Sequence, residues 1–154
     1  MPASSPARQL EGFLGRYSPE VAKVARQALR LLRRDLRGAF ELVYDNYNAL
    51  AIGFSPSDRA SDVIVSVAVY PRWVSLFFVR GAALPDPSGL LRGNGKQVRH
   101  VRLESAAVLK THGIQRLIHE AIERSPRGLD PAATRRLLIK SISATQRPRR
   151  PPDR

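Results

Sequence analysis

The sequence predicts an α+β fold in two layers, with an antiparallel meander β-sheet of about five to six strands flanked by N-terminal and C-terminal helices. Three observations lead to this prediction. A long amphipathic helical pattern precedes residue 38, short β-rich runs follow it, and a second amphipathic pattern ends near residue 124. The links between the runs are too short to hold crossover helices, so neighbouring strands should be antiparallel.

The helical signals before Gly38 come in two parts. A short helix is expected over residues 7–15. Ser18 and Pro19 then read as an N-cap and a proline at the first helical position. Apolar residues recur afterwards at three- and four-residue steps, and Gly38 is a typical C-terminal stop, so we expect a helix over residues 19–37.

The β-rich runs are bounded by turn residues, and the longest is apolar on both of its alternating faces. Strands of this kind need cover on both sides, and two helices cover only one of them. A subunit partner in a homodimer, the terminal helix, or a ligand cleft are the alternatives for the other face. The expected strands are 40–45, 48–54, 62–70, 73–80 and 98–103, followed by a helix from Thr111 to Arg124.

The chain of 154 residues is expected to hold one domain over residues 1–125 and a basic Pro/Arg-rich extension over 126–154. The extension contains a possible short strand at 136–142, and its end, 146–152, should be mobile and unable to pack a core. The absence of cysteine excludes a disulfide scaffold and a thiol nucleophile. Neither a signal peptide over residues 1–13 nor a membrane span is recognisable, so we expect a cytoplasmic protein without a membrane partner.

The net charge of +13 lies mainly at the two ends of the chain. Residues 1–37 hold 8 basic and 3 acidic groups, 38–125 hold 10 and 8, and 126–154 hold 8 and 2. A basic helix face and the Arg-rich tail could follow a phosphate backbone, although a solvated helix face is the simpler explanation. This alternative of electrostatic nucleic-acid binding uses Lys23, Arg26, Arg30, Arg33, Arg37, Arg147, Arg149 and Arg150.

Aromatic and polar side chains gather at two of the predicted turns, a pattern that is typical of a small ligand pocket and also of rim packing in a small sheet. The glycine-rich stretch 92–97 and the following Arg99 would offer backbone amides and cations to an anionic group, but an ordinary hairpin loop has the same composition. The candidate ligand-binding residues are Tyr44, Tyr47, Asn48, Tyr70, Trp73, Lys96 and Arg99.

Catalytic and metal-binding motifs give little support to other functions. The sequence has no nucleophile elbow, no His-Glu-x-x-His helix and no dinucleotide fingerprint. His112, His119 and Glu123 share one helix face, but that face lies away from the apolar stripe and should be solvated. We therefore expect no enzyme and no metal site, and the sequence indicates no particular cofactor.

Four motifs, in this order and spacing, resemble the YdhG-like family, which is catalogued as a domain of unknown function. The resemblance covers about residues 8–125 and implies an antiparallel meander sheet flanked by helices. The broader family includes a bacterial frataxin-like iron chaperone, so it also implies iron delivery as an alternative function. The motifs are 13–21 (FLGRYSPEV), 43–50 (VYDNYNAL), 70–74 (YPRWV) and 93–99 (GNGKQVR).

The best interpretation of the sequence is a non-catalytic module that binds an unidentified small or anionic ligand. Iron chaperoning is less well supported by the residues themselves, because the 19–37 helix carries only Glu20 and Asp35 as acids. Hard iron sites need clustered carboxylates. Nucleic-acid binding remains the second alternative.

Overall fold

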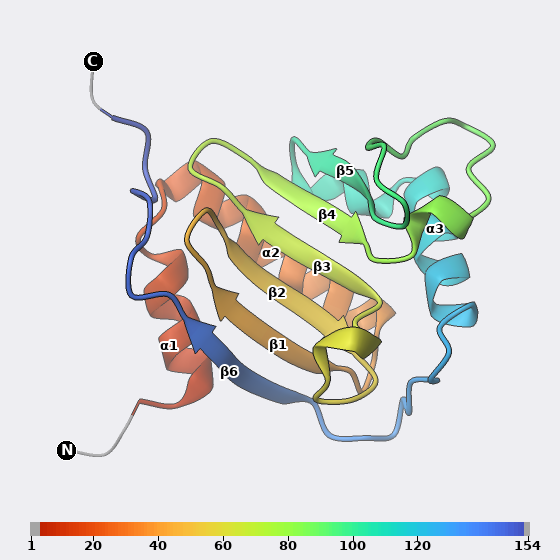
Figure 1. Cartoon of the computed structure of the whole chain (residues 1–154), viewed down its shortest axis with the longest axis horizontal. Helices are drawn as coiled ribbons and strands as arrows, with labels where there is room; N and C mark the ends of the chain where they lie inside the picture. The colour runs from red at the N-terminus through yellow and green to blue at the C-terminus, as the bar shows by residue number, and fades with distance from the viewer. Residues whose placement is uncertain (1–3, 153–154) are drawn as a thin grey trace.

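The computed structural model describes residues 4–152, which form two layers: three α-helices and one six-stranded sheet (Figure 1). The predicted α+β class is confirmed. No helix in this part of the chain has the length and apolar character needed to cross a membrane. The helices are α1 (Pro6–Leu14), α2 (Pro19–Asp35) and α3 (His112–Glu123), and the strands are β1 (Phe40–Asp45), β2 (Leu50–Ser55), β3 (Val65–Val69), β4 (Val74–Phe78), β5 (Arg99–Leu103) and β6 (Arg136–Ile142).

The start of α2 follows the capping pattern of the sequence. Ser18 lies just outside the helix with extended backbone angles, and its Oγ accepts a hydrogen bond from the Val21 backbone amide. Pro19 occupies the first turn, where its missing N–H costs no hydrogen bond. The same device begins α1, where the Ser5 side chain accepts from the Arg8 amide. These caps explain why both helices begin close to the predicted residues.

The strand order is β5-β4-β3-β2-β1-β6. Strands β1 to β5 pair antiparallel with their sequence neighbours, as predicted. The last strand departs from the prediction of an antiparallel meander, because β6 forms at residues 136–142 but pairs parallel to β1 at the opposite edge from β5. Residues 124–135 are long enough to carry the chain along the sheet to that edge, and Leu137 and Ile139 then pack against the core.

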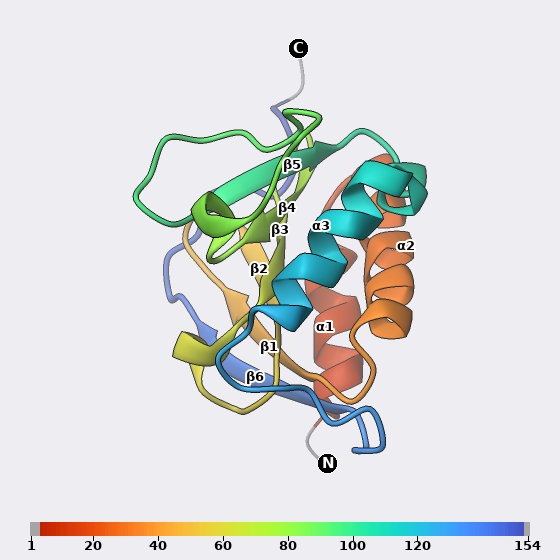
Figure 2. The ribbon, with the colours of Figure 1, turned by 90° about the vertical axis from the view of Figure 1, so that its right-hand side faces the viewer.

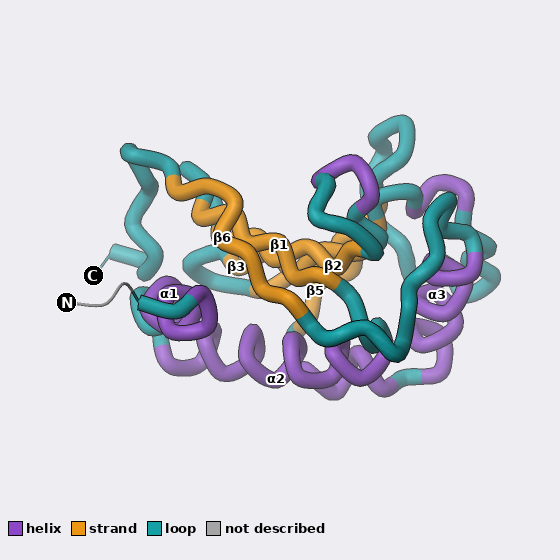
Figure 3. Tube along the Cα trace, turned by 90° about the horizontal axis from the view of Figure 1, so that it is seen from below, coloured by secondary structure: helices purple, strands orange, loops and turns teal. Residues whose placement is uncertain are grey.

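All three helices lie on one face of the sheet (Figures 2 and 3). Alternate strand residues point toward them, and one register row across the sheet illustrates the pattern. This row is almost entirely buried and is part of the hydrophobic core. Its members, from β1 to β5, are Val43, Ile52, Val67, Leu76 and Val101.

The outer face of the sheet is only partly covered, and by the chain itself. The β2–β3 connection folds over it, and the Val63 side chain approaches Gly53 so closely that an added Cβ would lie 3.0 Å from it. Lys140 of β6 donates a hydrogen bond to the Asp58 carbonyl of the same connection. Small residues in the centre of this face, such as Ala51 and Ser66, leave little apolar area to cover. A homodimer across this face stays a prediction.

The C-terminal segment after β6 also differs from expectation. The composition of residues 146–152 predicts a mobile segment that is unable to pack a core, yet Arg149 is only 3% exposed. The segment follows the β1–β2 turn, where the amides of Ser143 and Arg147 donate to the carbonyls of Asp45 and Tyr47. The buried guanidinium of Arg149 pairs with Asp45. The Pro/Arg-rich composition of the segment does not indicate this interaction.

The end of α2 carries a carboxylate whose charge opposes folding. Burial raises the pKa of Asp35, and the hydrogen bond from Gln115 Nε2 (3.2 Å) offsets this only in part. Because the pKa of Asp35 is raised in the folded state, the charged carboxylate lowers the free energy of unfolding. This cost is absent at low pH, where the carboxyl is protonated in both states, and it is reached in full as pH rises through the folded pKa.

Replacing this carboxylate should therefore change the pH dependence of stability. We expect Asp35→Asn to raise the free energy of unfolding relative to wild type at pH 7, and the gain to vanish near pH 3. Urea titrations at the two pH values measure it. Asp58→Asn, at an exposed aspartate, is the control; an equal response of both variants would contradict the prediction.

Candidate functional site

Two hairpin turns lie side by side at one end of the sheet. Asp45 pairs with Leu50, Leu50 with Val69, and Val69 with Val74, so the β1–β2 and β3–β4 turns leave the same register row. Between these turns and the C-terminal segment lies a groove of about 610 Å³. Its lining residues are Asn48, Tyr70, Pro71, Arg72, Trp73, Arg147, Pro148, Arg150, Pro151 and Pro152.

The aromatic wall of the groove is held in place by stacking. The rings of Tyr70 and Trp73 stack with centroids 4.8 Å apart and planes inclined by 23°. The guanidinium of Arg102, on β5, lies 5.1 Å from the centre of the Trp73 ring. Burial raises the pKa of the Tyr70 phenol, so this side chain is neutral at pH 7. The wall therefore offers a fixed, uncharged aromatic surface.

The charge in the groove is entirely positive. Arg72, Arg147 and Arg150 line it, and none of its lining residues is acidic. Among residues 4–152, no carboxylate lies within ion-pair distance of these three arginines. One hydrogen bond positions the Arg150 side chain: its Nε donates to the Arg16 carbonyl (3.1 Å). Three cations without an ion-pair partner among the described carboxylates make the groove attractive to an anion.

The C-terminal segment forms the second wall of the groove, and Arg149 holds it against the β1–β2 turn. Its Nη2 lies 2.9 Å from Asp45 Oδ1, and both side chains are almost fully buried. The guanidinium also donates to the carbonyls of Asn46 and Tyr47 and lies over the ring of Tyr17. The segment is thereby fixed to the β1–β2 turn and to the residues just before α2.

Tyr17 forms hydrogen bonds at the base of both hairpin turns. Its hydroxyl donates to the Val69 carbonyl (2.9 Å) and accepts from the Leu50 amide (3.2 Å). Both bonds fall in the register row from which the two turns leave. The relative position of the two turns is thus set by one buried phenol, whose pKa is raised by desolvation.

Three of the seven predicted ligand residues, Asn48, Tyr70 and Trp73, line this groove. Tyr47 stands beside it, 46% exposed, with the Arg147 guanidinium 5.5 Å from its ring centre. Tyr44 does not line it: its side chain lies on the outer face of the sheet. The Tyr44 hydroxyl is buried and has no hydrogen-bond partner within residues 4–152, and burial raises its pKa.

Lys96 and Arg99 do not join the aromatic residues, so the predicted single site of seven residues is wrong in this respect. Arg99 pairs with Phe78, whereas Val74, next to Trp73, pairs with Leu103. Four residues along a strand separate them by about 13 Å at roughly 3.3 Å per residue. Arg99 Nη1 instead donates to the carbonyls of its own loop, at residues 95 and 98.

Arginines that the sequence did not single out for this site provide its charge. From the sequence, Arg72 is only a member of the 70–74 motif, and Arg147 and Arg150 are candidates for the nucleic-acid alternative. The signal that would have placed them is the possible strand at 136–142. A strand added at the β1 edge carries the following residues to the β1–β2 turn.

The basic face of α2 is less available than its spacing suggests. Arg33 makes two-pronged hydrogen bonds to the buried carboxylate of Glu41, and Arg26 pairs with Glu11. Three of the predicted phosphate-binding residues are exposed: Lys23 and Arg30 on α2, and Arg37 just beyond its end. In the tail, Arg149 is wrong as a phosphate contact, because its guanidinium is buried against Asp45.

The histidines do not gather into a ligand set. His119 Nε2 lies 3.8 Å from Glu123 Oε1 on the exposed side of α3. Within residues 4–152, no three His, Asp or Glu side chains lie close enough together to hold a metal ion.

Comparisons with known proteins give no independent indication of function. No family model, curated protein or solved structure matches this chain. The resemblance to the YdhG-like family therefore stays a prediction, and the groove is the basis for a functional proposal.

Proposed function

We propose that the protein is a non-catalytic binding module that holds a small aromatic anion in the groove between its two hairpin turns and its C-terminal segment. The observation that carries the proposal is the meeting of three arginines with the Tyr70–Trp73 stack in one groove whose lining contains no acid. Arg147 and Arg150 would hold the anionic group, and Trp73 would carry the ring.

The size and composition of the groove support a small ligand. Its volume of about 610 Å³ falls within the roughly 300–1,000 Å³ that is usual for small-molecule sites. Planar guanidiniums pair well with carboxylate and phosphate oxygens. Aromatic side chains stack on flat ligand rings, and this stacking tolerates different rings. Both kinds of group line the groove: the Tyr70 and Trp73 rings come from the β3–β4 turn, and the guanidiniums of Arg147 and Arg150 come from the C-terminal segment.

The residue types also favour binding over catalysis. The groove is lined by amide, phenol, indole, proline and guanidinium groups. A general base works best with a pKa near the operating pH, and the side chains most often used for this role, His, Asp and Glu, are absent from the groove lining. Burial moves the phenol of Tyr70 further from that range, since it raises the pKa.

The single tryptophan of the chain gives a direct test. Titration with adenosine 5′-monophosphate should change the fluorescence of Trp73, whereas adenosine and inorganic phosphate alone should bind more weakly. Replacing Arg147 or Arg150 with glutamine should each weaken binding about tenfold, as expected for a charge-assisted hydrogen bond. Arg116→Gln, on the exposed side of α3, is the control with the same change of net charge.

Three results would contradict the proposal. The first is no binding of the nucleotide at millimolar concentration. The second is an equal loss of affinity in the Arg116 control. The third is much tighter binding of a single-stranded oligonucleotide, weakening steeply with salt, which would favour the nucleic-acid alternative.

A further inference from the structure

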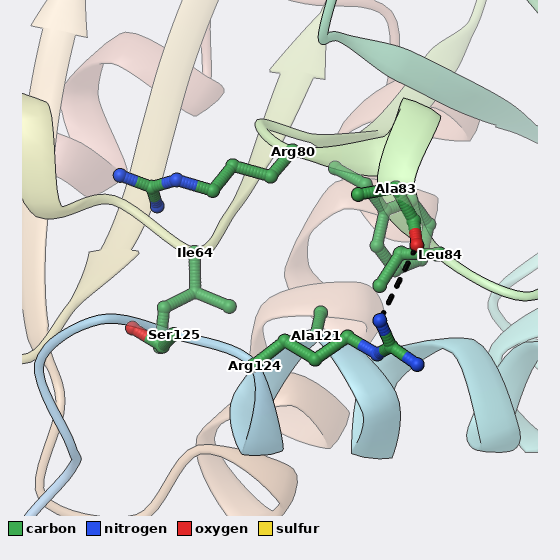
Figure 4. A pocket seen from close by; sticks show the side chains of 8 residues that line it. Ile64, Arg80, Ala83, Leu84, Ala121, Arg124 and Ser125 are labelled. Carbon is green, nitrogen blue, oxygen red and sulfur yellow. Dashed lines mark hydrogen bonds between the residues drawn. The ribbon is translucent and has the colours of Figure 1, made fainter.

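A second cavity lies at the end of the sheet opposite the groove. It opens between β4, α3 and the short 3-10 turn Gly81–Ala83, and it has a volume of about 250 Å³. Figure 4 shows its lining from close by. Phe78 belongs to the register row of Arg99, so the cavity and Trp73 are separated by the length of β4. It is lined by Ile64, Phe78, Arg80, Ala83, Leu84, Ala121, Arg124 and Ser125.

The floor of this cavity is apolar and belongs to the core. Ile64, Phe78 and Leu84 are all buried. The methyl group of Ala121 points toward the cavity from α3, opposite the stem of Arg80 (Figure 4). The small side chains at Ala83 and Ala121 leave the space open, because a larger residue at either position would occupy it. An apolar ligand would therefore find a preformed site.

The rim of the same cavity is cationic. The guanidiniums of Arg80 and Arg124 lie on opposite sides of the apolar lining in Figure 4, and no acidic residue lines the cavity. Within residues 4–152, Arg80 has no carboxylate at ion-pair distance. Arg124 is positioned by Glu120, 3.0 Å from its Nε, and by the Ala83 carbonyl, to which its Nη1 donates (3.5 Å). Its remaining N–H groups are unused by these contacts.

We propose that this cavity binds a small carboxylic acid with an aliphatic or aromatic body, the body resting on the apolar floor and the carboxylate meeting the guanidinium of Arg80 at the rim. An apolar cavity of about 150 Å³ is large enough for benzene. The larger volume here accommodates a body of that kind together with a carboxylate. A neutral molecule of the same shape gains only the apolar contacts and makes no ion pair with Arg80.

Octanoate is the probe for this site, and octanol is its neutral counterpart. Isothermal titration calorimetry should give a dissociation constant for octanoate of about 0.1–1 mM, the range expected for a ligand of this size. Octanol should bind at least about tenfold more weakly. Arg147→Gln, in the groove at the other end of the sheet, should leave octanoate binding unchanged, which separates this site from the proposed function.

Variants of the cavity lining decide the outcome. Ala121→Leu should fill the space and weaken octanoate binding at least about tenfold, and Ala83→Leu does the same from the other wall if the first variant is unstable. Arg80→Gln should weaken octanoate but not octanol. The matched controls are Ala7→Leu, on the exposed side of α1, and Arg116→Gln.

The proposal is overturned if octanol binds as tightly as octanoate. It also fails if both leucine variants keep wild-type affinity, if Arg116→Gln lowers the affinity as much as Arg80→Gln, or if octanoate does not bind at several millimolar. Thermal unfolding of each variant establishes that it is folded before its affinity is compared.

Discussion

Replacing Arg149 with methionine should lower the free energy of unfolding by about 3 kcal/mol, the lower end of the usual cost of breaking a buried ion pair. The change leaves the carboxylate of Asp45 buried without its closest cation. Arg16 Nη1 remains 3.5 Å from Asp45 Oδ2 and keeps the loss from being larger. Methionine preserves most of the apolar stem, so the effect reports the loss of the guanidinium, with its charge and its hydrogen bonds to the Asn46 and Tyr47 carbonyls.

Urea unfolding followed through Trp73 measures this change, and Arg150→Met is the neighbouring control. Arg150 is exposed and makes no ion pair with a described carboxylate, so its replacement should cost less than about 0.5 kcal/mol. Adding Asp45→Asn to Arg149→Met should recover part of the loss, because the unpaired charge is then gone. A loss below about 1 kcal/mol for Arg149→Met would show that the segment contributes little to stability.

The second large effect is expected at Gly38. Its φ of +80° lies in the left-handed region, and an added Cβ would overlap the carbonyl oxygen of Asp130. The left-handed conformation alone costs a non-glycine residue about 1–2 kcal/mol. The overlap adds to this cost, because the atom in the way belongs to the backbone and cannot rotate aside. We expect Gly38→Ala to lose at least about 2 kcal/mol of unfolding free energy.

Gly89→Ala separates the two contributions. Gly89 also has a positive φ, of +63°, but an added Cβ there meets no atom within 4 Å. It should therefore show the conformational cost alone, about 1 kcal/mol, when measured by the same urea titration. Equal losses for the two variants would mean that the segment around Asp130 moves aside freely.

The sequence predicts those parts of the fold whose signals are local. Ser18 and Pro19 mark the beginning of α2, and turn residues mark the ends of the five antiparallel strands. Each of these signals acts through a few neighbouring backbone groups, so it survives without knowledge of the rest of the molecule. The position of Asn48, Tyr70 and Trp73 near one another follows from the same short turns.

The features that escaped prediction depend on contacts between distant residues. Nothing in the composition of 146–152 indicates that Arg149 is buried, because its partner Asp45 lies on the first strand. The parallel direction of β6 likewise depends on the path of residues 124–135 along the sheet. Chemistry alone places Arg99 in one site with Trp73, whereas the strand register sets Arg99 opposite Phe78, at the other end of β4 from Trp73.

The β1–β6 pair has a consequence for how the molecule assembles. Phe40 pairs with Arg136, so this contact closes a loop holding most of the chain, whereas the β1–β2 and β3–β4 hairpins each close only four residues. Closure entropy and contact order both favour the hairpins first. Until β6 arrives, β1 is a bare edge, and Glu41 and Asp45 lack the cations Arg135 and Arg149. One late segment thus completes the sheet, adds a second cation to each of two buried acids and creates the groove in a single event.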